Sequence, residues 1–483
     1  MSQENYTLLC DYYELTMANG YFELGRKDEI AYFDVFFRTI PDGGGFAIFA
    51  GLEQLVDYVR NLRFTDEDIR FLRTKGTFSE GFLDYLRTFR FSGDIYAMQE
   101  GTPIFPGEPI LTVRAPVIEA QIIETFVLLT VNLQSLIATK ANRIVRAAEG
   151  RAVAEFGSRR AQGAQGAILG ARAAFIGGCG STACTISDRE YHIPATGTMA
   201  HSWVQMFPDE YSAFSAYCKL YPQNATLLVD TYNVLESGIP NAIRVFKEEG
   251  ITKCGIRIDS GDIAYLSKKA RKMLDAAGLF DCRIVASNSL DEFIIRDLIS
   301  QGAKIDAFGV GERLITAKSD PVFGCVYKLA AIEDEAGNVV PKIKVSENNE
   351  KITNPSYKKV YRIVDNETKQ AIADYITLAD EVVDESKPLV LFDPVSTWKK
   401  KTVTNYTARP LHIPVFRDGV CVYDLPAIEE IKEYCEAEVA SLWDEVKRFE
   451  NPHRYYVDLS EQLWNLKREM LENAGRVEEG ANK

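Results

Sequence analysis

The stretch that decides the fold is Ala225–Glu312, where a short apolar run followed by a segment of helical spacing occurs three times. The runs are ATLLVD (Ala225–Asp230), KCGIRID (Lys253–Asp259) and RIVASN (Arg283–Asn288), and each stops at Asp or Asn. A fourth run, KIDAFG, ends in the turn Gly309-Val310-Gly311. Apolar runs that alternate with helices in this way predict βαβ units and a parallel sheet.

Polar residues gather where these predicted strands end. In parallel sheets of this kind, the residues just past the carboxyl ends of the strands meet in one crevice or barrel mouth. The residues at these positions are Asp230, Arg257, Asp259, Ser287, Asn288, Gly309 and Gly311. Acids, an arginine, hydroxyl and amide groups and flexible glycines together predict a site for a phosphorylated ligand that is rich in hydroxyl groups.

Three further units of the same kind precede this stretch. We expect strands in AVAEF (Ala152–Phe156), in AAFI (Ala173–Ile176) and in the IPAT segment that begins at Ile193. Together with the later runs they make seven βα-type units between Ala152 and Glu312, which is close to the eight of a (β/α)₈ barrel.

Candidate site residues follow each of these three predicted strands. Arg159 and Arg160 form either an anion site before a helix or a surface charge pair. The loop Gly177–Thr182 can bring backbone N–H groups and the hydroxyls of Ser181 and Thr182 to a ligand, and its lack of an acid suits a carboxylate better than an amide. His201 falls in the first turn of the next helix. A lone histidine is usually structural, but its position level with the other strand ends favours a functional role.

The fold class predicted for the whole chain is α/β, with an irregular βα barrel (TIM-like), an N-terminal α/β domain completed by later residues, and a helical C-terminal tail. The expected limits are 1–130 for the N-terminal domain, 131–325 for the barrel that carries the active site, 326–410 for a β-rich segment returning to the N-terminal domain, and 411–483 for the helical region. Val117–Glu149 is expected to be a buried pair of helices, with Arg143 near its end either solvated or at the site. The residues after Gly324 predict a hairpin that turns at Glu335–Asn338.

Composition excludes several classes of protein. The net charge of −14 over 483 residues argues against binding to nucleic acid, which needs a basic face. No apolar run approaches the roughly 18 uncharged residues of a membrane span, so no membrane segment is expected. Nine scattered cysteines without CxxC spacing indicate free thiols and a cytoplasmic protein. Four histidines without ligand spacing give no metal site.

Several motifs in this order resemble the nicotinate phosphoribosyltransferase family. They are LLCDYYELTMANGYF near the start, then EFGSRRAQG, GTMAHSW, RIDSGD, SNSLDE and FGVGERL, and later KITNPSYKKVYR and NPHRYYVDLSEQLWNLK. The resemblance covers nearly the whole chain. It implies a homodimer with active sites at the subunit interface, and the joining of nicotinate to phosphoribosyl pyrophosphate, coupled to ATP hydrolysis, as the entry step of NAD salvage.

The resemblance also implies roles for individual residues. His201 corresponds to the histidine that ATP transiently phosphorylates, Phe156 to the ring that stacks on the pyridine, and Tyr13 to a ring that closes the other face from the partner subunit. Asp259 corresponds to the acid that holds the ribose hydroxyls. The remaining positions that the resemblance places at substrate or phosphate are Tyr21, Arg38, Arg143, Arg159, Ser181, Thr182, Arg257, Ser287, Asn288, Gly309 and Gly311.

The resemblance implies Mg²⁺ bound through substrate phosphates, with ATP as a co-substrate. Mg²⁺ prefers such phosphates and water to a cage of protein ligands, which agrees with the lack of a ligand cluster in the sequence. Two alternatives stay open at this point. One is a phosphoribosyltransferase specific for nicotinamide or quinolinate, and the other is a relative that binds nucleotide without catalysis.

Overall fold

The computed structural model describes residues 5–347 and 351–481, with side chains described as far as residue 474. Contacts within the chain divide it into two compact units. Unit 1 comprises Met1–Leu136 together with Val322–Lys483, and unit 2 comprises Ile137–Pro321. The chain thus leaves unit 1 inside one long helix, after Leu136, and returns to it at Val322. The expected limits of the barrel were residues 131 and 325.

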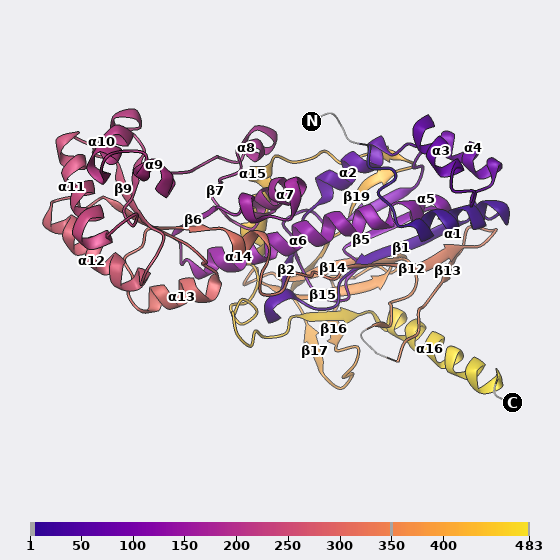
Figure 1. Cartoon of the computed structure of the whole chain (residues 1–483). Coiled ribbons are helices and arrows are strands. Elements are labelled where there is room, and N and C mark those ends of the chain that lie inside the picture. Colours follow the sequence, from indigo (N-terminus) through magenta and orange to yellow (C-terminus); the bar gives the residue numbers. More distant parts are fainter. Residues whose placement is uncertain (1–4, 348–350, 482–483) are drawn as a thin grey trace. The chain divides into compact units, whose positions relative to one another are not determined.

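Unit 2 is built on a parallel sheet that curls into an open half-barrel (Figure 1). Its strand order is β7-β6-β11-β10-β9-β8, so the first strand of the unit lies beside the last. The strands are β6 (Ala152–Glu155), β7 (Ser181–Thr182), β8 (Ala225–Leu228), β9 (Cys254–Ile258), β10 (Arg283–Ser287) and β11 (Ala307–Val310). The helices are α7 (Gly163–Ile176), α8 (Thr185–Tyr191), α9 (His201–Gln205), α10 (Glu210–Leu220), α11 (Ile239–Glu248), α12 (Ile263–Ala276), α13 (Glu292–Ser300) and α14 (Glu312–Ile315), with short turns η2 (Ser158–Arg160) and η3 (Val234–Gly238).

Acidic residues just past the strands start the helices of unit 2. Asp262 accepts a hydrogen bond from the N–H of Tyr265 and begins α12, and Asp291 accepts from the N–H groups of Phe293 and Ile294 and begins α13. Such caps satisfy N–H groups that have no partner within the helix. The strands themselves are apolar and buried in a common core with the helices. Polar residues that follow the strands therefore begin the next helices at one edge of the sheet.

The α/β class and the half-barrel are confirmed, but two of the seven predicted strands are wrong. Ala173–Ile176 forms the last turn of α7, because Ala-rich sequence favours a helix and Phe175 and Ile176 are buried on its inner side. The segment after Ile193 contributes a single bridge, between Ala195 and Thr182. In the described part of the chain the sheet accordingly has six strands.

Unit 1 contains an antiparallel sheet with the order β13-β12-β1-β5-β3-β19-β20. The predicted hairpin is confirmed, because β12 pairs with β13, and β12 also pairs with β1 of the N-terminal segment. Later residues therefore complete the N-terminal domain, as expected. The strands are β1 (Ile30–Phe36), β3 (Asp94–Ala97), β5 (Leu111–Pro116), β12 (Val326–Glu333), β13 (Val339–Pro341), β19 (Ile413–Arg417) and β20 (Val420–Cys421).

A second sheet of unit 1 has the order β18-β14-β15-β21. Strand β21 lies between the two C-terminal helices and pairs in parallel with β15, although the sequence predicts a helical region over 411–483. The strands are β14 (Lys358–Asp365), β15 (Ala371–Leu378), β18 (Tyr406–Pro410) and β21 (Tyr456–Leu459), with the small pairs β2 (Ala47–Ile48) and β4 (Pro103–Ile104), and β16 (Leu389–Phe392) and β17 (Lys400–Val403). The helices are α1 (Tyr12–Glu23), α2 (Leu52–Asn61), α3 (Asp66–Arg73), α4 (Glu80–Arg87), α5 (Val117–Ile122), α15 (Ile428–Ala440) and α16 (Glu461–Ala481), with the turn η1 (Pro41–Gly43).

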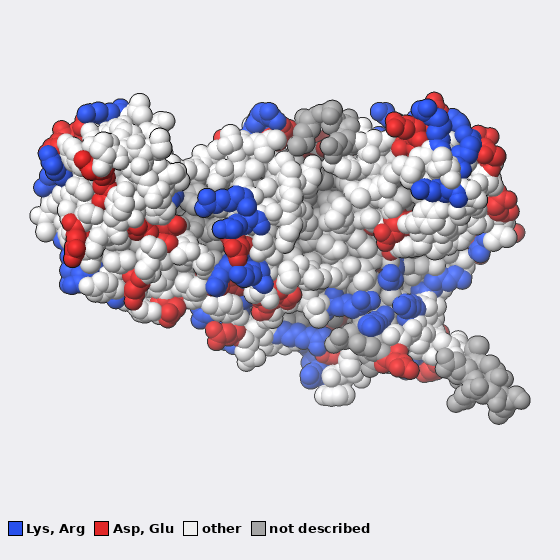
Figure 2. Space-filling model, in the orientation of Figure 1, with Lys and Arg blue, Asp and Glu red and all other residues white. Residues whose placement is uncertain are grey.

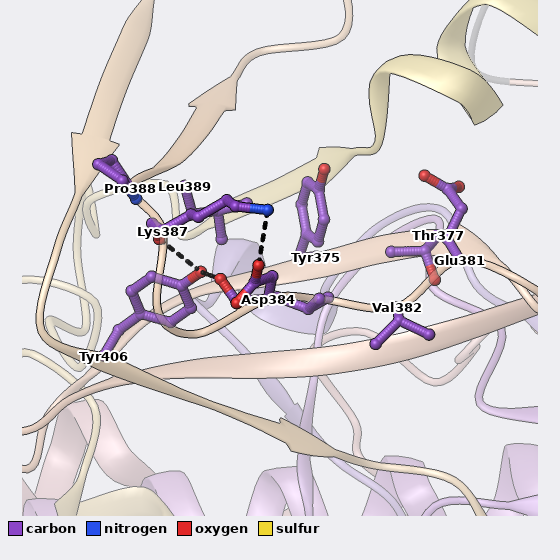
Figure 3. A pocket seen from close by; sticks show the side chains of 10 residues that line it. Tyr375, Thr377, Glu381, Val382, Asp384, Lys387, Pro388, Leu389 and Tyr406 are labelled. Atoms are coloured by element: carbon purple, nitrogen blue, oxygen red, sulfur yellow. Dashed lines mark hydrogen bonds and ion pairs between the residues drawn. The ribbon is translucent and has the colours of Figure 1, made fainter.

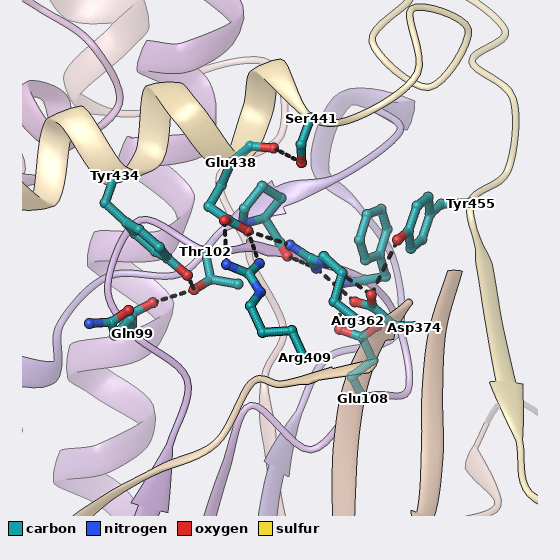
Figure 4. Close-up of polar contacts among 12 residues, drawn as sticks. Gln99, Thr102, Glu108, Arg362, Asp374, Arg409, Tyr434, Glu438, Ser441 and Tyr455 are labelled. Carbon is teal, nitrogen blue, oxygen red and sulfur yellow. Dashed lines mark hydrogen bonds and ion pairs between the residues drawn. The ribbon is translucent and has the colours of Figure 1, made fainter. Parts of the chain in front are cut away.

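A fully buried arginine joins four of these elements (Figure 4). The guanidinium of Arg362 on β14 donates to both oxygens of Asp374 on β15, at 2.9 and 2.7 Å, and to Glu438 on α15 at 3.0 Å. It also donates to the carbonyl oxygen of Pro103 on β4 at 2.7 Å. Burial and the neighbouring Asp374 raise the pKa of the Glu108 carboxyl well above its usual range. The cluster ties the early strand β4 to segments that follow 259 to 335 residues later in the chain.

The predicted helix pair is α5 and α6 (Glu124–Ala147), and most of it is buried. By length and composition alone this pair could cross a membrane, with a mean hydropathy of 1.6 over its most apolar window, although its longest run without a charged residue, Thr125–Thr139, is shorter than 18 residues. Of that window, 72% is buried inside the protein, as in a core helix. On the face in view, acidic and basic side chains are both present, and several Lys and Arg side chains lie next to one another below its centre (Figure 2).

Candidate active site

Two aspartates and a serine are joined at the carboxyl ends of β8, β9 and β10. One carboxylate oxygen of Asp230 accepts a hydrogen bond from the backbone N–H of Asp259 (3.0 Å) and another from the hydroxyl of Ser260 (2.6 Å). The hydroxyl of Ser287 donates to one carboxylate oxygen of Asp259. Asp230 is nearly buried, whereas the Asp259 side chain is 35% exposed. Asp230 therefore shapes the turn, and Asp259 presents its carboxylate to solvent.

The imidazole of His201 lies beside these carboxylates. It is the first residue of α9, and its side chain is 41% exposed. Nδ1 lies 3.1 Å from the hydroxyl of Thr231, and Nε2 lies 3.9 Å from a carboxylate oxygen of Asp230 and of Asp259. One nitrogen is thus anchored, and the other faces two negative charges without a direct hydrogen bond to either. Thr231 follows the ATLLVD run directly, but sequence reasoning did not select it.

Arg257 is a second partly buried group at this edge. Its guanidinium donates to the hydroxyl of Thr198 (2.6 Å) and to the carbonyl oxygen of Met199 (3.0 Å). Nε is buried and has no hydrogen-bond partner in the described part of the chain. Burial lowers the pKa of Arg257, the two nearby aspartates oppose that effect, and the cation of Arg159 adds to it. Two guanidinium groups therefore lie close enough to repel each other, an arrangement that an anion would relieve.

The two predicted glycines lie against Phe156. The N–H of Phe156 donates to the carbonyl oxygen of Val310 (2.7 Å), which aligns the end of β6 with β11. A Cβ at Gly309 would lie 2.5 Å from the Phe156 ring, and a Cβ at Gly311 would lie 3.0 Å from the carbonyl oxygen of Phe156. The absence of a side chain at Gly309 therefore sets the position of the ring, a role that differs from the phosphate contact expected from the sequence.

Ser181 and Thr182 differ in their surroundings. Thr182 is fully buried, and its hydroxyl donates to the carboxylate of Glu155 (2.6 Å) and accepts from the N–H of Cys184 (3.0 Å). Glu155 also accepts from the N–H of Gly157, and its burial raises the pKa of its carboxyl. Thr182 thus supports the Phe156 turn from inside the protein. Ser181 is partly exposed and can reach a ligand.

The Gly177–Thr182 loop does not form the predicted cradle of free N–H groups. The N–H groups of Gly178, Cys179 and Gly180 donate to carbonyl oxygens of the chain at 3.0, 3.0 and 2.9 Å. A Cβ at Gly177 would lie 2.4 Å from the carbonyl oxygen of Ala138. The glycines are therefore needed for close packing on α6, and the expectation that this loop selects a carboxylate has no structural support.

Two further predicted residues of unit 2 are Arg143 and Asn288. Arg143 is 3% exposed, so its solvated interpretation is wrong: its Nε donates to Glu292 at 2.9 Å, beside Lys140. Asn288 has a left-handed backbone (φ 85°), and its side-chain oxygen accepts from Ser289 (3.2 Å). These groups belong to unit 2. Their predicted contacts with substrate stay predictions.

Unit 1 holds the other candidates. Tyr13 and Tyr21 lie on α1; Tyr13 is 45% exposed, and Tyr21 is half-buried. Arg38 lies just past β1, with its guanidinium 6.0 Å from the ring of Phe36. Unit 1 also has a cavity of about 170 Å³, lined by Tyr375, Asp384, Lys387 and Tyr406 among others, which contains none of the predicted site residues (Figure 3).

In residues 5–347 and 351–481, no group of three or more His, Cys, Asp or Glu side chains is arranged to hold a metal ion. Oxygen ligands for a hard cation are nevertheless present at the strand ends. One carboxylate oxygen of Asp230 is buried without a hydrogen-bond partner in the described chain, and Asp259 is partly exposed beside it. Two carboxylates without further protein ligands suit a Mg²⁺ ion that takes its other ligands from substrate phosphates and water.

Family models match most of the chain. The model of the nicotinate phosphoribosyltransferase (NAPRTase) N-terminal domain matches residues 8–132, the NAPRTase family model matches 152–372, and the C-terminal domain model matches 357–467. The chain is 46% identical over 479 residues to nicotinate phosphoribosyltransferase from Bacillus subtilis (strain 168), covering 99% of this chain and 97% of that protein. It is 30% identical to the human protein of the same name, covering 95% of each.

Solved structures agree with these matches. The crystal structure of human nicotinic acid phosphoribosyltransferase superposes with a TM-score of 0.83 at 28% identity, covering 96% of this chain and all of that one. A nicotinate-nucleotide pyrophosphorylase from Pyrococcus furiosus superposes with a TM-score of 0.70 at 22% identity, covering 91% and 97% of the two chains, which shows a shared fold.

Proposed function

The chain belongs to the nicotinate phosphoribosyltransferase family, and from this premise we propose that ATP hydrolysis drives its reaction through a phosphohistidine at His201. The reaction of the family joins nicotinate and phosphoribosyl pyrophosphate to give nicotinate mononucleotide and pyrophosphate, which serves NAD salvage. The observation that carries the proposal is the His201 imidazole, which is anchored at Nδ1 and accessible at Nε2.

Phosphoribosyl transfer demands charge stabilisation more than proton transfer. Breaking the bond between ribose C1 and pyrophosphate leaves positive charge on the ribose and negative charge on the leaving group. In this proposal the Asp259 carboxylate holds the ribose hydroxyls and the positive charge, and Arg257 with Arg159 holds anionic groups; the support is the partly exposed Asp259 carboxylate and the proximity of the two guanidinium groups. Positioning of the reactants by such fixed groups lowers the barrier by an amount that rises with the precision of the geometry.

The histidine step proceeds by in-line transfer. With the proton on Nδ1 donated to the Thr231 hydroxyl, the Nε2 lone pair attacks the γ-phosphorus of ATP. The bond from that phosphorus to its bridging oxygen breaks, and ADP leaves. Water later cleaves the N–P bond and returns imidazole and phosphate. The phosphoryl group adds negative charge and acceptor oxygens near Arg257, so it can order the arginines and raise substrate affinity while it persists.

Magnesium and the partner subunit complete the proposal. Asp259 and Asp230 would hold Mg²⁺ together with phosphate oxygens, and the ion when bound would neutralise charge on pyrophosphate. We assign the pyridine to the face of Phe156, with Tyr13 of a second copy on the other side, in a cytoplasmic homodimer. Stacking between two rings adds about 0.5–1.5 kcal/mol beyond the burial of area.

The test is pyrophosphate release from phosphoribosyl pyrophosphate and nicotinate with Mg²⁺, with and without ATP. We expect His201→Ala to lose ATP stimulation and to retain the basal rate, and the wild type to acquire an acid-labile phosphate from ATP. His192→Asn is the matched control, because His192 has a left-handed backbone (φ 59°) that Asn accepts, and it should retain stimulation. If ATP stimulates His201→Ala as much as the wild type, the phosphohistidine is refuted. If pyrophosphate is released with nicotinamide or quinolinate but not with nicotinate, the substrate assigned to the enzyme is wrong.

A further inference from the structure

Glu14 on α1 is a completely buried acid with an incomplete set of partners. One carboxylate oxygen accepts from the backbone N–H of Thr125 (3.1 Å) and from its hydroxyl (2.5 Å), at the start of α6. The other oxygen is buried and has no hydrogen-bond partner in the described chain, and the same holds for the hydroxyl of Tyr58 on α2. A buried carboxylate with a free oxygen is costly, so the site favours the uncharged acid.

The groups that face Glu14 are mainly acidic. Glu124 at the start of α6 and Asp11 before α1 carry negative charge, and Cys10, Tyr58 of α2 and Tyr327 of β12 would add charge only by losing a proton. Lys328 on β12 is a cation that acts on Glu124. Burial, with smaller contributions from Glu124 and Asp11, raises the pKa of Glu14 to about 8, although the Thr125 hydrogen bonds oppose the increase.

Tyr13, the residue before Glu14, lies near Glu124, the residue before Thr125. Burial, and then the charge of Glu124, raises the pKa of the Tyr13 hydroxyl, and the Glu124 carboxylate accepts from the side-chain amide of Gln121 (2.8 Å). The two hydrogen bonds from Thr125 to Glu14 fasten one turn of α1 to the first turn of α6, and Tyr13 lies in that turn of α1. The ring of Tyr13 is left 45% exposed on top of this attachment.

We propose that Glu14 is a positioning residue for the Tyr13 ring, acting through its two hydrogen bonds with Thr125, which fix the turn of α1 that carries Tyr13. The inference rests on the role proposed above for Tyr13 at the pyridine. Ionisation of Glu14 would add a charge beside Glu124 and Asp11, weaken the attachment of α1, and so loosen the ring.

The pH dependence has a definite sign. An unfolded Glu titrates near its ordinary pKa of about 4.3, and the folded group near 8. The folded state therefore binds more protons between these values, and stability falls as pH rises from about 4 to 8. Above pH 8, Glu14 ionises within the folded protein, and we expect the KM for nicotinate to rise there.

The kinetic test compares wild type and Glu14→Gln, since Gln mimics the protonated acid. We expect the KM of the wild type for nicotinate to rise about fivefold or more between pH 7 and 9, whereas that of Glu14→Gln stays flat; this corresponds to about 1 kcal/mol. Thr125→Val should raise KM at every pH. Glu119→Gln, a buried acid of α5 bonded to Ser92, is the control and should keep the KM profile of the wild type.

Hydrogen exchange of the α1 amides without substrate separates this inference from the proposed function. We expect α1 protection to fall above pH 8 in the wild type and to persist in Glu14→Gln. Equal exchange profiles in the two proteins would overturn the inference, whatever the kinetics. If the pH dependence of α1 exchange differs between wild type and Glu14→Gln but the pH dependence of the KM for nicotinate does not, the positioning role is overturned. A KM for nicotinate unchanged in Tyr13→Ala would instead refute the role proposed for Tyr13.

Discussion

The backbone N–H of Asp259 donates a 3.0 Å hydrogen bond to the side chain of Asp230, so one aspartate of the site sets the position of the other. Asp230 is nearly buried and also accepts from Ser260, whereas Asp259 is partly exposed. Adjacent parallel strands of the half-barrel supply the two residues, and the geometry of the turn depends on their contact.

We therefore predict that Asp230→Ala lowers kcat/KM about 10- to 100-fold, because two donors lose their acceptor and the Asp259 turn moves. Asp306→Ala is the matched control. Asp306 accepts from the N–H of Ile284 (2.7 Å) before β11, at the other end of the sheet. It should cost comparable stability without the loss of kcat/KM, and equal kinetic losses would mean that Asp230 acts only through stability.

The packing of Phe156 on Gly309 predicts a specific effect on nicotinate. In Gly309→Ala the new methyl group would lie 2.5 Å from the ring, which must move. We expect the KM for nicotinate to rise about tenfold with a smaller change for phosphoribosyl pyrophosphate. Gly166→Ala on α7, where the nearest atom to a Cβ would be 3.9 Å away, should leave both KM values unchanged.

Ser181 and Thr182 should separate substrate contact from structure. Thr182→Val removes the donor to Glu155 inside the protein and should lower the free energy of unfolding by about 1–3 kcal/mol, measured by denaturant unfolding. Ser181→Ala should leave unfolding unchanged and raise a substrate KM. A kinetic defect in Thr182→Val without loss of stability would contradict the structural assignment of Thr182.

The Arg362 cluster in Figure 4 predicts that a substitution outside the predicted site residues lowers stability strongly. Arg362→Met would leave the buried carboxylate of Asp374 without its ion-pair partner, whereas Glu438 would keep its contacts with Arg409. Removing one member of such a buried pair costs about 3–5 kcal/mol, so we expect a strongly lowered Tm. Arg26→Met is the control: its salt bridge with Glu29 is exposed, and Tm should not change measurably.

Asp458 on β21 predicts a pH-dependent stability. Burial, and then the charge of Asp393, raises the pKa of its carboxyl to about 7, above the unfolded value of about 3.9. Because the folded state binds the extra proton, its contribution to stability is fully present below pH 4 and is lost as pH rises to 7. Asp458→Asn should therefore gain Tm relative to wild type over this range, and a constant difference from pH 4 to 7 would contradict the shift.

Much of unit 2 could be read from the sequence alone. The strands β8, β9, β10 and β11 were predicted because each apolar run stops at a polar residue or glycine and is followed by helical spacing, which are local properties of the chain. The same local signals placed Asp230, Asp259 and Ser287 at one edge of a sheet, whereas the strand predicted before His201 is only a single bridge. The family motifs then led to the nicotinate phosphoribosyltransferase family, which the comparisons confirm.

Tertiary packing decided what local signals could not. Ala173–Ile176 has the composition of a strand or a helix, and its burial on α7 selected the helix. The glycines of Gly177–Thr182 look like a ligand loop, but the distance to the Ala138 carbonyl shows that they allow close packing. Arg143 reads as a solvated residue until Glu292, 149 residues later, accepts from it. Strand and helix boundaries depend on neighbours in the chain, whereas burial and pairing depend on residues brought together only by folding.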